Sequence, residues 1–317
     1  MSQAAFTNTT VQFYPQGNPT YRLIALWYFL ILLTLWNLLG HLYLGFEQPW
    51  VAPFVGVGTA MLMQLLLEWV DARVNQRPPR YAGGAANFIN LLVPGIIPGF
   101  ACAMLLFPNE RMWPIAFAAA LSVASKVLFR APVGGGRTQH FFNPSNLGIA
   151  TTLILFPEVG FAPPYHFTAN LVGIWDWVVP VFILLTGVVI HGFFTGRLPL
   201  VAAWLIGFAL QGQIRAQLYG FPPAVPLMPM TSAAFIVFTL YMIPDPATTP
   251  LNKWRQVLFG FSVAMVYGWI QMMHWVFGLF FALVAVCLVR GISLHLYHAF
   301  KSRGPASAQP VPAAASA

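Results

Sequence analysis

Charged residues are so scarce in this chain that they exclude a water-soluble fold. Only 7% of its 317 residues are Asp, Glu, Lys or Arg, and 58% are hydrophobic. A soluble domain of ordinary composition is about 25% charged. So few charges cannot cover the surface of a soluble globule of this size, and the sequence therefore predicts an all-α polytopic membrane protein with the lipid bilayer as its partner. We interpret the net charge of +8 as a record of membrane topology, and we expect no nucleic acid as a partner.

Long apolar runs divide the chain into membrane spans. A spanning helix needs about 20 mostly apolar residues. Pro94 and Pro98 fall in the third run, and a Pro-Asp-Pro sequence ends the eighth, so we expect both of these helices to be interrupted. The ten predicted transmembrane helices are residues 22–45, 50–70, 83–107, 113–130, 145–157, 177–194, 198–212, 229–244, 256–271 and 273–290.

The basic residues predict the orientation of these spans. If both termini are cytoplasmic, every Lys and Arg except Arg111 and Arg215 lies on the cytoplasmic side. This is the positive-inside pattern, so we expect a multi-pass protein of the inner (cytoplasmic) membrane. The first span follows a segment without bases before Arg22 and lacks a small-residue cleavage site, which indicates a retained signal anchor.

Ten spans divide into two sets of five, and a repeat with an odd number of spans inserts its second copy upside down. The sequence thus predicts two inverted five-helix repeats, whose working site lies where interrupted helices of the two halves meet. The predicted organisation is a polar N-terminal segment at 1–20, a first repeat at 21–157, an outer linker at 158–176, a second repeat at 177–292 and a disordered tail at 302–317.

The first polar segment lies between the fourth and fifth predicted spans. Glycines allow a close backbone approach to a ligand, and the start of a helix favours anions. Two interpretations stay open here: a cytoplasmic turn followed by a helix cap, or a cradle for a phosphate or an isoalloxazine ring. In the second interpretation the cofactor-binding residues are Gly135, Gly136, Arg137, His140, Asn143, Ser145 and Asn146.

The second polar segment is the Pro-Asp-Pro sequence at the end of the eighth span. Asp245 lies between its two prolines, and Thr248 and Thr249 follow within one turn. An acid at the membrane edge could hold a cation or accept a hydrogen bond from a ring N–H, with the two threonines as further cofactor-binding residues. The alternative is a structural role, in which Asp245 caps the ninth helix and pairs with Lys253 or Arg255.

Glu68 is the other acid that topology does not explain. It lies about one turn inside the cytoplasmic end of the second span, where it either pairs with Arg73 or joins Asp245 in an ion or proton path. We expect no metal site, because Cys102 and Cys287 lack a metal-ligand spacing. We assign no catalytic residue, because HExxH, P-loop and GxSxG motifs are missing from the sequence.

Two stretches of the chain resemble a known family. GGGRTQHFFNPSNLGIATTLILFP (134–157) resembles the Phe-Asn-Pro segment of the RnfD/NqrB membrane-subunit family, and MTSAAFIVFTLYMIPDPATTPLNKWRQVLFG (230–260) resembles its Thr-Asp-Pro-Val-Thr segment. The resemblance implies ten helices in two inverted five-helix repeats, a fold shared with urea channels. It also implies a flavin-carrying subunit of a redox-driven ion-pumping complex.

The chain departs from that family at the flavin attachment site. The family attaches FMN to a Thr in a Ser/Thr-Gly-Ala-Thr motif, and no Gly-Ala-Thr occurs in this sequence. We therefore do not expect covalent FMN, and a noncovalent flavin or a quinone becomes the candidate cofactor. The chain is most similar to the flavin-motif-less UnbU-type branch, which is associated with enediyne biosynthesis.

The resemblance implies a function in electron transfer, in a subunit that is not itself an enzyme and that acts with other membrane or redox subunits. The alternative from the residues is an inverted-repeat transporter or channel for a small solute, an ion or a biosynthetic product.

Overall fold

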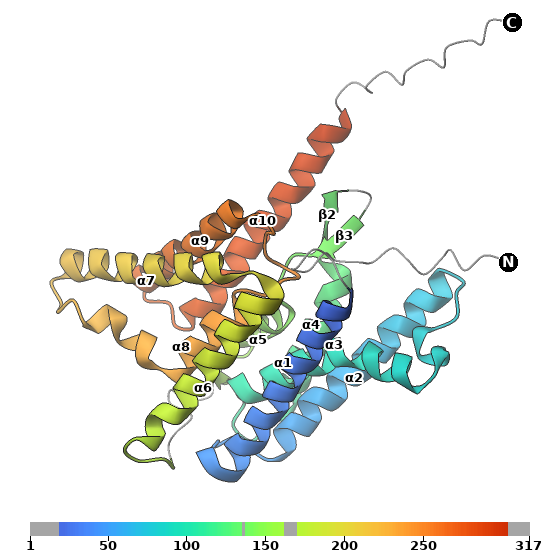
Figure 1. Cartoon of the computed structure of the whole chain (residues 1–317), viewed down its shortest axis with the longest axis horizontal. Helices are drawn as coiled ribbons and strands as arrows, with labels where there is room; N and C mark the ends of the chain where they lie inside the picture. Colours follow the sequence, from blue (N-terminus) through green and yellow to red (C-terminus); the bar gives the residue numbers. More distant parts are fainter. Residues whose placement is uncertain (1–18, 135–136, 162–169, 304–317) are drawn as a thin grey trace, which may run out of the picture.

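The computed structural model describes residues 19–134, 137–161 and 170–303, which form a bundle of α-helices (Figure 1). Each of the ten predicted segments overlaps with one of these helices. The first half holds α1 (Pro19–Leu39), α2 (Val51–Val74), α3 (Ala85–Leu105), α4 (Trp113–Leu128) and α5 (Pro144–Leu155). The second half holds α6 (Trp175–Val189), α7 (Leu198–Tyr219), α8 (Ala233–Val237), α9 (Lys253–Met272) and α10 (Gly278–Arg303).

Shorter elements join and extend these helices. Strand β1 (Leu106–Phe107) pairs antiparallel with β4 (Gly160–Phe161), and β2 (Arg130–Gly134) pairs antiparallel with β3 (Arg137–His140). Two 3₁₀ segments, η2 (Arg80–Gly83) and η4 (Val225–Thr231), precede α3 and α8. Three π-helical turns continue α1, α6 and α8; they are η1 (Gly40–Leu44), η3 (Ile190–Thr195) and η5 (Phe238–Met242).

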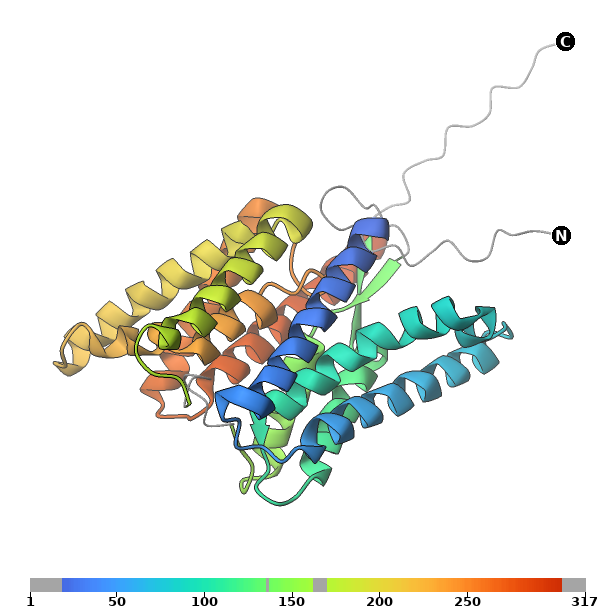
Figure 2. The same cartoon turned by 60° about the horizontal axis from the view of Figure 1, so that its bottom comes forward.

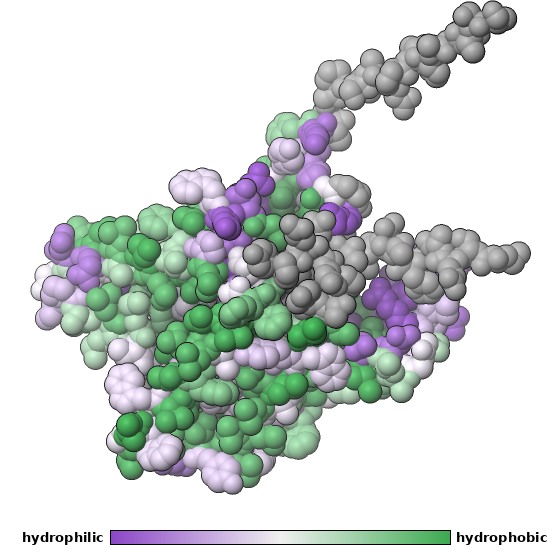
Figure 3. All heavy atoms as spheres, viewed as in Figure 1, coloured by the Kyte–Doolittle hydropathy of each residue, from purple (hydrophilic) through white to green (hydrophobic). Residues whose placement is uncertain are grey.

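The helices have the length and apolarity of a multi-pass membrane protein. Within the described residues, six are long and apolar enough to cross a bilayer: Leu23–Leu44, Val51–Val74, Ala85–Leu105, Trp175–Thr195, Leu198–Tyr219 and Gly278–Lys301. A seventh candidate is the pair Val225–Thr231 and Ala233–Met242, which is bent by 73°. Apolar side chains cover most of the face in Figure 3, whereas hydrophilic ones gather at the far ends of α2–α3 and α7 and along the end of α10. Such a surface is suited to contact with lipid.

The third predicted span is not interrupted, because a neighbouring helix repairs its backbone. Pro98 has no N–H to donate to the carbonyl of Pro94 one turn earlier. The Nζ of Lys126 on α4 donates a hydrogen bond to that carbonyl instead. The helix α3 therefore continues from Ala85 to Leu105, with both prolines inside it. The eighth span is bent by 73°, but the bend lies at its start, between Val225–Thr231 and Ala233–Met242, and not at the Pro-Asp-Pro sequence from which the interruption was predicted.

Small residues allow close helix packing in both halves, as is common between membrane helices. A Cβ added to Gly148 on α5 would lie 2.3 Å from the carbonyl oxygen of Ala118 on α4. A Cβ added to Gly260 on α9 would also lie 2.3 Å from a carbonyl oxygen, that of Leu200 on α7. Each glycine thus permits a backbone approach that a side chain would prevent.

The helices α1 and α6 lie side by side in opposite directions, and the two halves of the chain meet along them (Figures 1 and 2). Trp36 packs edge-on against Phe182 at 5.4 Å between ring centroids, and the Tyr28 hydroxyl donates to the Thr186 carbonyl at 3.3 Å. Both helices end in a π-helical turn that is closed by a left-handed glycine, Gly45 in the first half and Gly196 in the second.

Some of the predicted segments fall on residues that the structure does not describe. Residues 1–18 of the polar N-terminal segment, residues 162–169 of the outer linker and residues 304–317 of the tail lie outside the described ranges, as do Gly135 and Gly136. The last helix continues to Arg303, beyond the predicted end of its span at residue 290.

Candidate functional site

The two polar segments singled out from the sequence meet at one cavity. It has a volume of about 220 Å³, far above the roughly 10–15 Å³ that one water molecule needs. The first segment contributes His140, Asn143 and Ser145 to its wall, and the second contributes Asp245. The remaining wall comes from α1, α3, α4, η3 and η5, so residues of both halves enclose the cavity.

Asn143 holds the two segments together. Its Nδ2 donates to the carbonyl of Met242 at 3.0 Å. Its Oδ1 accepts from the backbone N–H of Asn146 at 2.9 Å and from the hydroxyl of Ser145 at 3.0 Å, which caps the start of α5. A second bond crosses nearby, from the Gln139 side chain to the Ala247 carbonyl. Asn143 therefore serves as both a helix cap and a bridge.

The turn after η5 presents the carboxylate of Asp245 to the cavity. One carboxylate oxygen accepts from the Ala247 N–H at 2.9 Å, and the Asp245 carbonyl accepts from the hydroxyl of Thr249 at 2.7 Å. Thr248 and Thr249 are almost fully buried, and they do not belong to the described cavity wall. The structure thus places the two threonines, predicted to bind a cofactor, as supports of the turn.

Asp245 does not cap the ninth helix. Asn252 caps α9 instead, and its side chain accepts from the N–H groups of Trp254 at 3.0 Å and Arg255 at 3.3 Å. The carboxylate of Asp245 therefore interacts with its own turn, through the Ala247 N–H, and lines the cavity.

Burial raises the pKa of Asp245 above its ordinary value, because burial disfavours the charged form; the Ala247 N–H, Lys126, Thr248 and Arg197 oppose this rise. The native protein then binds this proton more tightly than the unfolded chain does. Stability consequently falls as the pH rises from the ordinary carboxyl pKa of about 4 through the raised value.

Asp245→Asn should remove this cost of ionisation. We expect the variant to have a higher unfolding midpoint than the wild type at pH 8, and the difference to vanish near pH 4. Thermal unfolding of the purified protein across this pH range measures the effect. A variant that is less stable than the wild type at pH 8 would show that the carboxylate is required by the fold.

His191 also lines the cavity, although it was not among the site residues predicted from the sequence. Its Nε2 donates to the Leu240 carbonyl in η5, and its Nδ1 accepts from the Thr195 hydroxyl at 2.8 Å. Because a carbonyl can only accept, Nε2 carries the proton in this arrangement. Both ring nitrogens are in use, so His191 is a clamp between η3 and η5.

Arg197 lies buried behind the Asp245 turn, with 2% of its surface exposed. Its guanidinium donates to the hydroxyl of Thr249 at 2.9 Å and to the carbonyls of Thr195 at 3.1 Å and Pro246 at 3.3 Å. Burial lowers the pKa of Arg197 to about 10, which keeps it cationic at neutral pH. From the sequence it served only as a marker of the cytoplasmic side.

The other residues of the first polar segment lie in different surroundings. Asn146 is buried and is not among the described residues of the cavity wall; its Nδ2 donates to the Phe280 carbonyl at 3.0 Å, which ties α5 to α10. Arg137 is exposed on β3 and is not among the described residues of the cavity wall. Of the residues predicted in this first segment, three therefore line the cavity: His140, Asn143 and Ser145.

The structure does not bring Glu68 to this cavity. Its carboxylate accepts from Nη1 of Arg77 at 2.6 Å and from the backbone N–H of Arg80 at 2.8 Å. Arg73, the partner expected from the sequence, lies instead over the ring of Trp69 at 5.7 Å. That Glu68 belongs to an ion or proton path stays a prediction. Its contacts with Arg77 and Arg80 hold the loop that follows α2.

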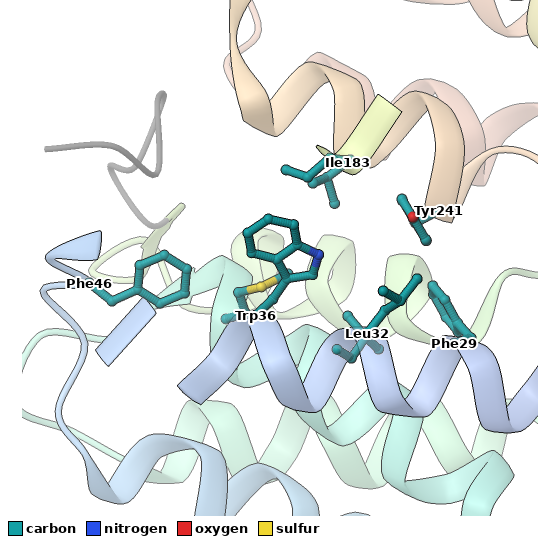
Figure 4. Close-up of a pocket in the computed structure, with 9 residues that line it drawn as sticks. Phe29, Leu32, Trp36, Phe46, Ile183 and Tyr241 are labelled. Carbon is teal, nitrogen blue, oxygen red and sulfur yellow. The ribbon is translucent and has the colours of Figure 1, made fainter. Parts of the chain in front are cut away.

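Figure 4 shows a second, much smaller hollow of about 20 Å³, which shares two lining residues with the cavity. Its wall is apolar and includes Trp36, Phe46 and Ile183. Phe29 and Tyr241 line both hollows, and their rings stack at 5.3 Å with planes 8° apart. This stacked pair therefore stands between the larger cavity and the apolar seam where α1 and α6 meet.

Comparison with models of protein families gives no match, and comparison with curated proteins gives no similar sequence.

Proposed function

We propose that this protein is a membrane subunit that binds a small planar redox ligand, a noncovalent flavin or a quinone, in the cavity and takes part in electron transfer. One observation carries the proposal: two polar segments about 100 residues apart in sequence, joined by the Asn143–Met242 bond, enclose a single cavity between the halves. Two independent surface turns would not be expected to line the same cavity.

The chemistry of the cavity wall suits such a ligand. Phe29, Ile97 and Leu240 offer apolar surface to a flat ring. Lys126 can donate a hydrogen bond to a ring carbonyl, and Asp245 can accept one from a ring N–H. A bound flavin or quinone would supply the redox chemistry, and these residues would bind and orient it. No Gly-Ala-Thr is present for covalent attachment.

The architecture we propose has ten spans in two inverted five-helix repeats, with both termini in the cytoplasm. The matched ends of α1 and α6, each a π-helical turn followed by a left-handed glycine, support the repeat. The antiparallel course of these two helices supports the inversion (Figure 1). The cytoplasmic membrane is the location we propose, from the distribution of the basic residues.

The visible spectrum and extractable quinone of the purified full-length protein test the proposed ligand. We expect the wild type to carry or to bind one of the two groups. Asp245→Asn should reduce this binding at least severalfold without lowering the unfolding midpoint, and Lys253→Gln, on the exposed start of α9, should leave it unchanged. A colourless wild-type preparation that binds neither added flavin nor added quinone would contradict the proposal.

A transporter or channel is the second candidate, and the stacked pair Phe29–Tyr241 favours it. The two hollows that share this pair follow the seam between the halves. In liposomes, Phe29→Ala should increase the flux of a small solute or ion over that of the wild type. No flux through either protein would exclude this candidate.

A further inference from the structure

We propose that the cavity binds an anionic group, a phosphate or a carboxylate, beside Lys126 and the start of α5. This inference rests on the proposal above that the cavity is a binding site, and it adds a subsite for an anion beside the site for the ring. It runs against the cation path for which Asp245 was a candidate.

The distribution of acids is the first argument. The chain has seven acids, all of them within the described ranges. Glu68 is held by Arg77, and Asp71 is held by the same arginine. The remaining four lie near the ends of helices opposite to the ends that form the cavity; they are Glu47, Glu110, Glu158 and Asp176. Asp245 is thus the single carboxylate that the site can draw on.

The cations at the site outnumber that carboxylate. Lys126 lines the cavity, and Arg197 is buried directly behind the Asp245 turn, bonded to Thr249 and to two carbonyls. Asp245 can offset one of these positive charges and leaves at least one more. Lys126 already donates to the Pro94 carbonyl and its charge acts on Asp245, so the fully buried Arg197 is the cation that a single carboxylate does not balance. A buried charge is costly, and an anion in the cavity would bring the net charge of the site closer to zero.

The start of α5 adds to the positive character of the same wall. Asn143 and Ser145, the cap residue and a residue of the first turn, both line the cavity. The N-terminal end of a helix carries a partial positive charge that favours anions. Lys126 and this helix end are therefore both positive, and both attract an anionic ligand.

The anion could reach the site from two sources, a soluble molecule or a lipid headgroup. Apolar residues of two candidate membrane spans, Leu26 on α1 and Ile97 on α3, also line the cavity. Phosphate is the group common to both sources, so inorganic phosphate is the probe, and the lipid composition separates them.

Titration of the purified full-length protein with inorganic phosphate at low ionic strength tests the inference. The protein is placed in phosphatidylcholine nanodiscs, and calorimetry measures the binding. We expect the wild type to bind phosphate. Lys126→Gln should weaken this binding at least tenfold, Lys126→Arg should restore most of it, and Lys253→Gln should change it less than twofold. Asp245→Asn should tighten it severalfold, because the carboxylate repels phosphate.

The opposite sign for Asp245→Asn would overturn the inference, and so would a wild type that does not respond to phosphate. If that protein still carries flavin or quinone, the proposed function stands and the anion site falls. If the protein binds phosphate but takes up neither flavin nor quinone, the anion site stands and the proposed function falls. Loss of the phosphate response in nanodiscs with phosphatidylglycerol would assign the site to a lipid headgroup, and retention would assign it to a soluble anion.

Discussion

Gly148→Val should destabilise the protein by about 3 kcal/mol or more, the largest loss that we expect from a single substitution in the first half. The reason is steric. A Cβ at this position would lie 2.2 Å from the Ser122 hydroxyl and 2.3 Å from the Ala118 carbonyl oxygen, and the latter belongs to the backbone of α4. The helices α4 and α5 would have to separate, and Asn143 at the start of α5 would lose its position at the cavity.

Gly58→Val is the matched control. Gly58 also lies inside a helix, α2, but no atom lies within 4 Å of an added Cβ. At about 2–4 °C per kcal/mol, Gly148→Val should lower the unfolding midpoint by roughly 6 °C or more, and Gly58→Val should lower it by much less. Fluorescence-detected size-exclusion chromatography after heating provides the measurement. Equal midpoints for the two variants would contradict the close packing of α4 against α5.

Arg197→Met should have the second large effect, a loss of stability together with a loss of ligand binding. Removing the guanidinium leaves the carbonyls of Thr195 and Pro246 buried without this donor, at a cost of about 1–3 kcal/mol for each such group. The substitution also removes the desolvation penalty of the buried guanidinium, and this gain opposes the cost. We expect the unpaired carbonyls to outweigh this gain, so that the variant is less stable than the wild type, because backbone groups cannot move away from the site.

Arg197→Lys and Arg255→Met separate the causes of this effect. Lysine keeps the charge but has no planar fork, so we expect partial recovery of the unfolding midpoint. Arg255 is exposed on α9, and Arg255→Met should be close to neutral. If Arg197→Met melts with the wild type and still binds ligand, the buried cation does not support the Asp245 turn.

The positions of the helices could be predicted from the sequence, because apolar runs and the prolines and charges between them are local signals. The eighth span is bent as well, but near Ser232, at the opposite end of the span from the Pro-Asp-Pro sequence that predicted a break. The predicted break in α3 was wrong for a reason that the local sequence does not contain. The donor that replaces the N–H missing at Pro98 comes from Lys126, on a different helix.

The site was predicted in part, again for a physical reason. Asn143 and Asp245 stood out because polar residues are costly at a membrane boundary. His191, Lys126 and Arg197 were missed as site residues, since each was explained by its place in a span or by the positive-inside pattern. A histidine inside an apolar run and a base next to a span end were the available signals, but their partners become visible only when the two halves pack.

The most direct test of the central claim is a cross-link between the two polar segments. In a protein whose native cysteines are replaced, Gln139→Cys and Ala247→Cys are combined, and a protease site is inserted after Gly220, between the two positions. Gln139 bonds to the Ala247 carbonyl across the two segments, so we predict that oxidation or a short thiol cross-linker joins the fragments on a non-reducing gel after cleavage. The pair Gln139→Cys with Lys253→Cys should remain separate. Fragments that separate in the first pair as readily as in the second would contradict a shared cavity.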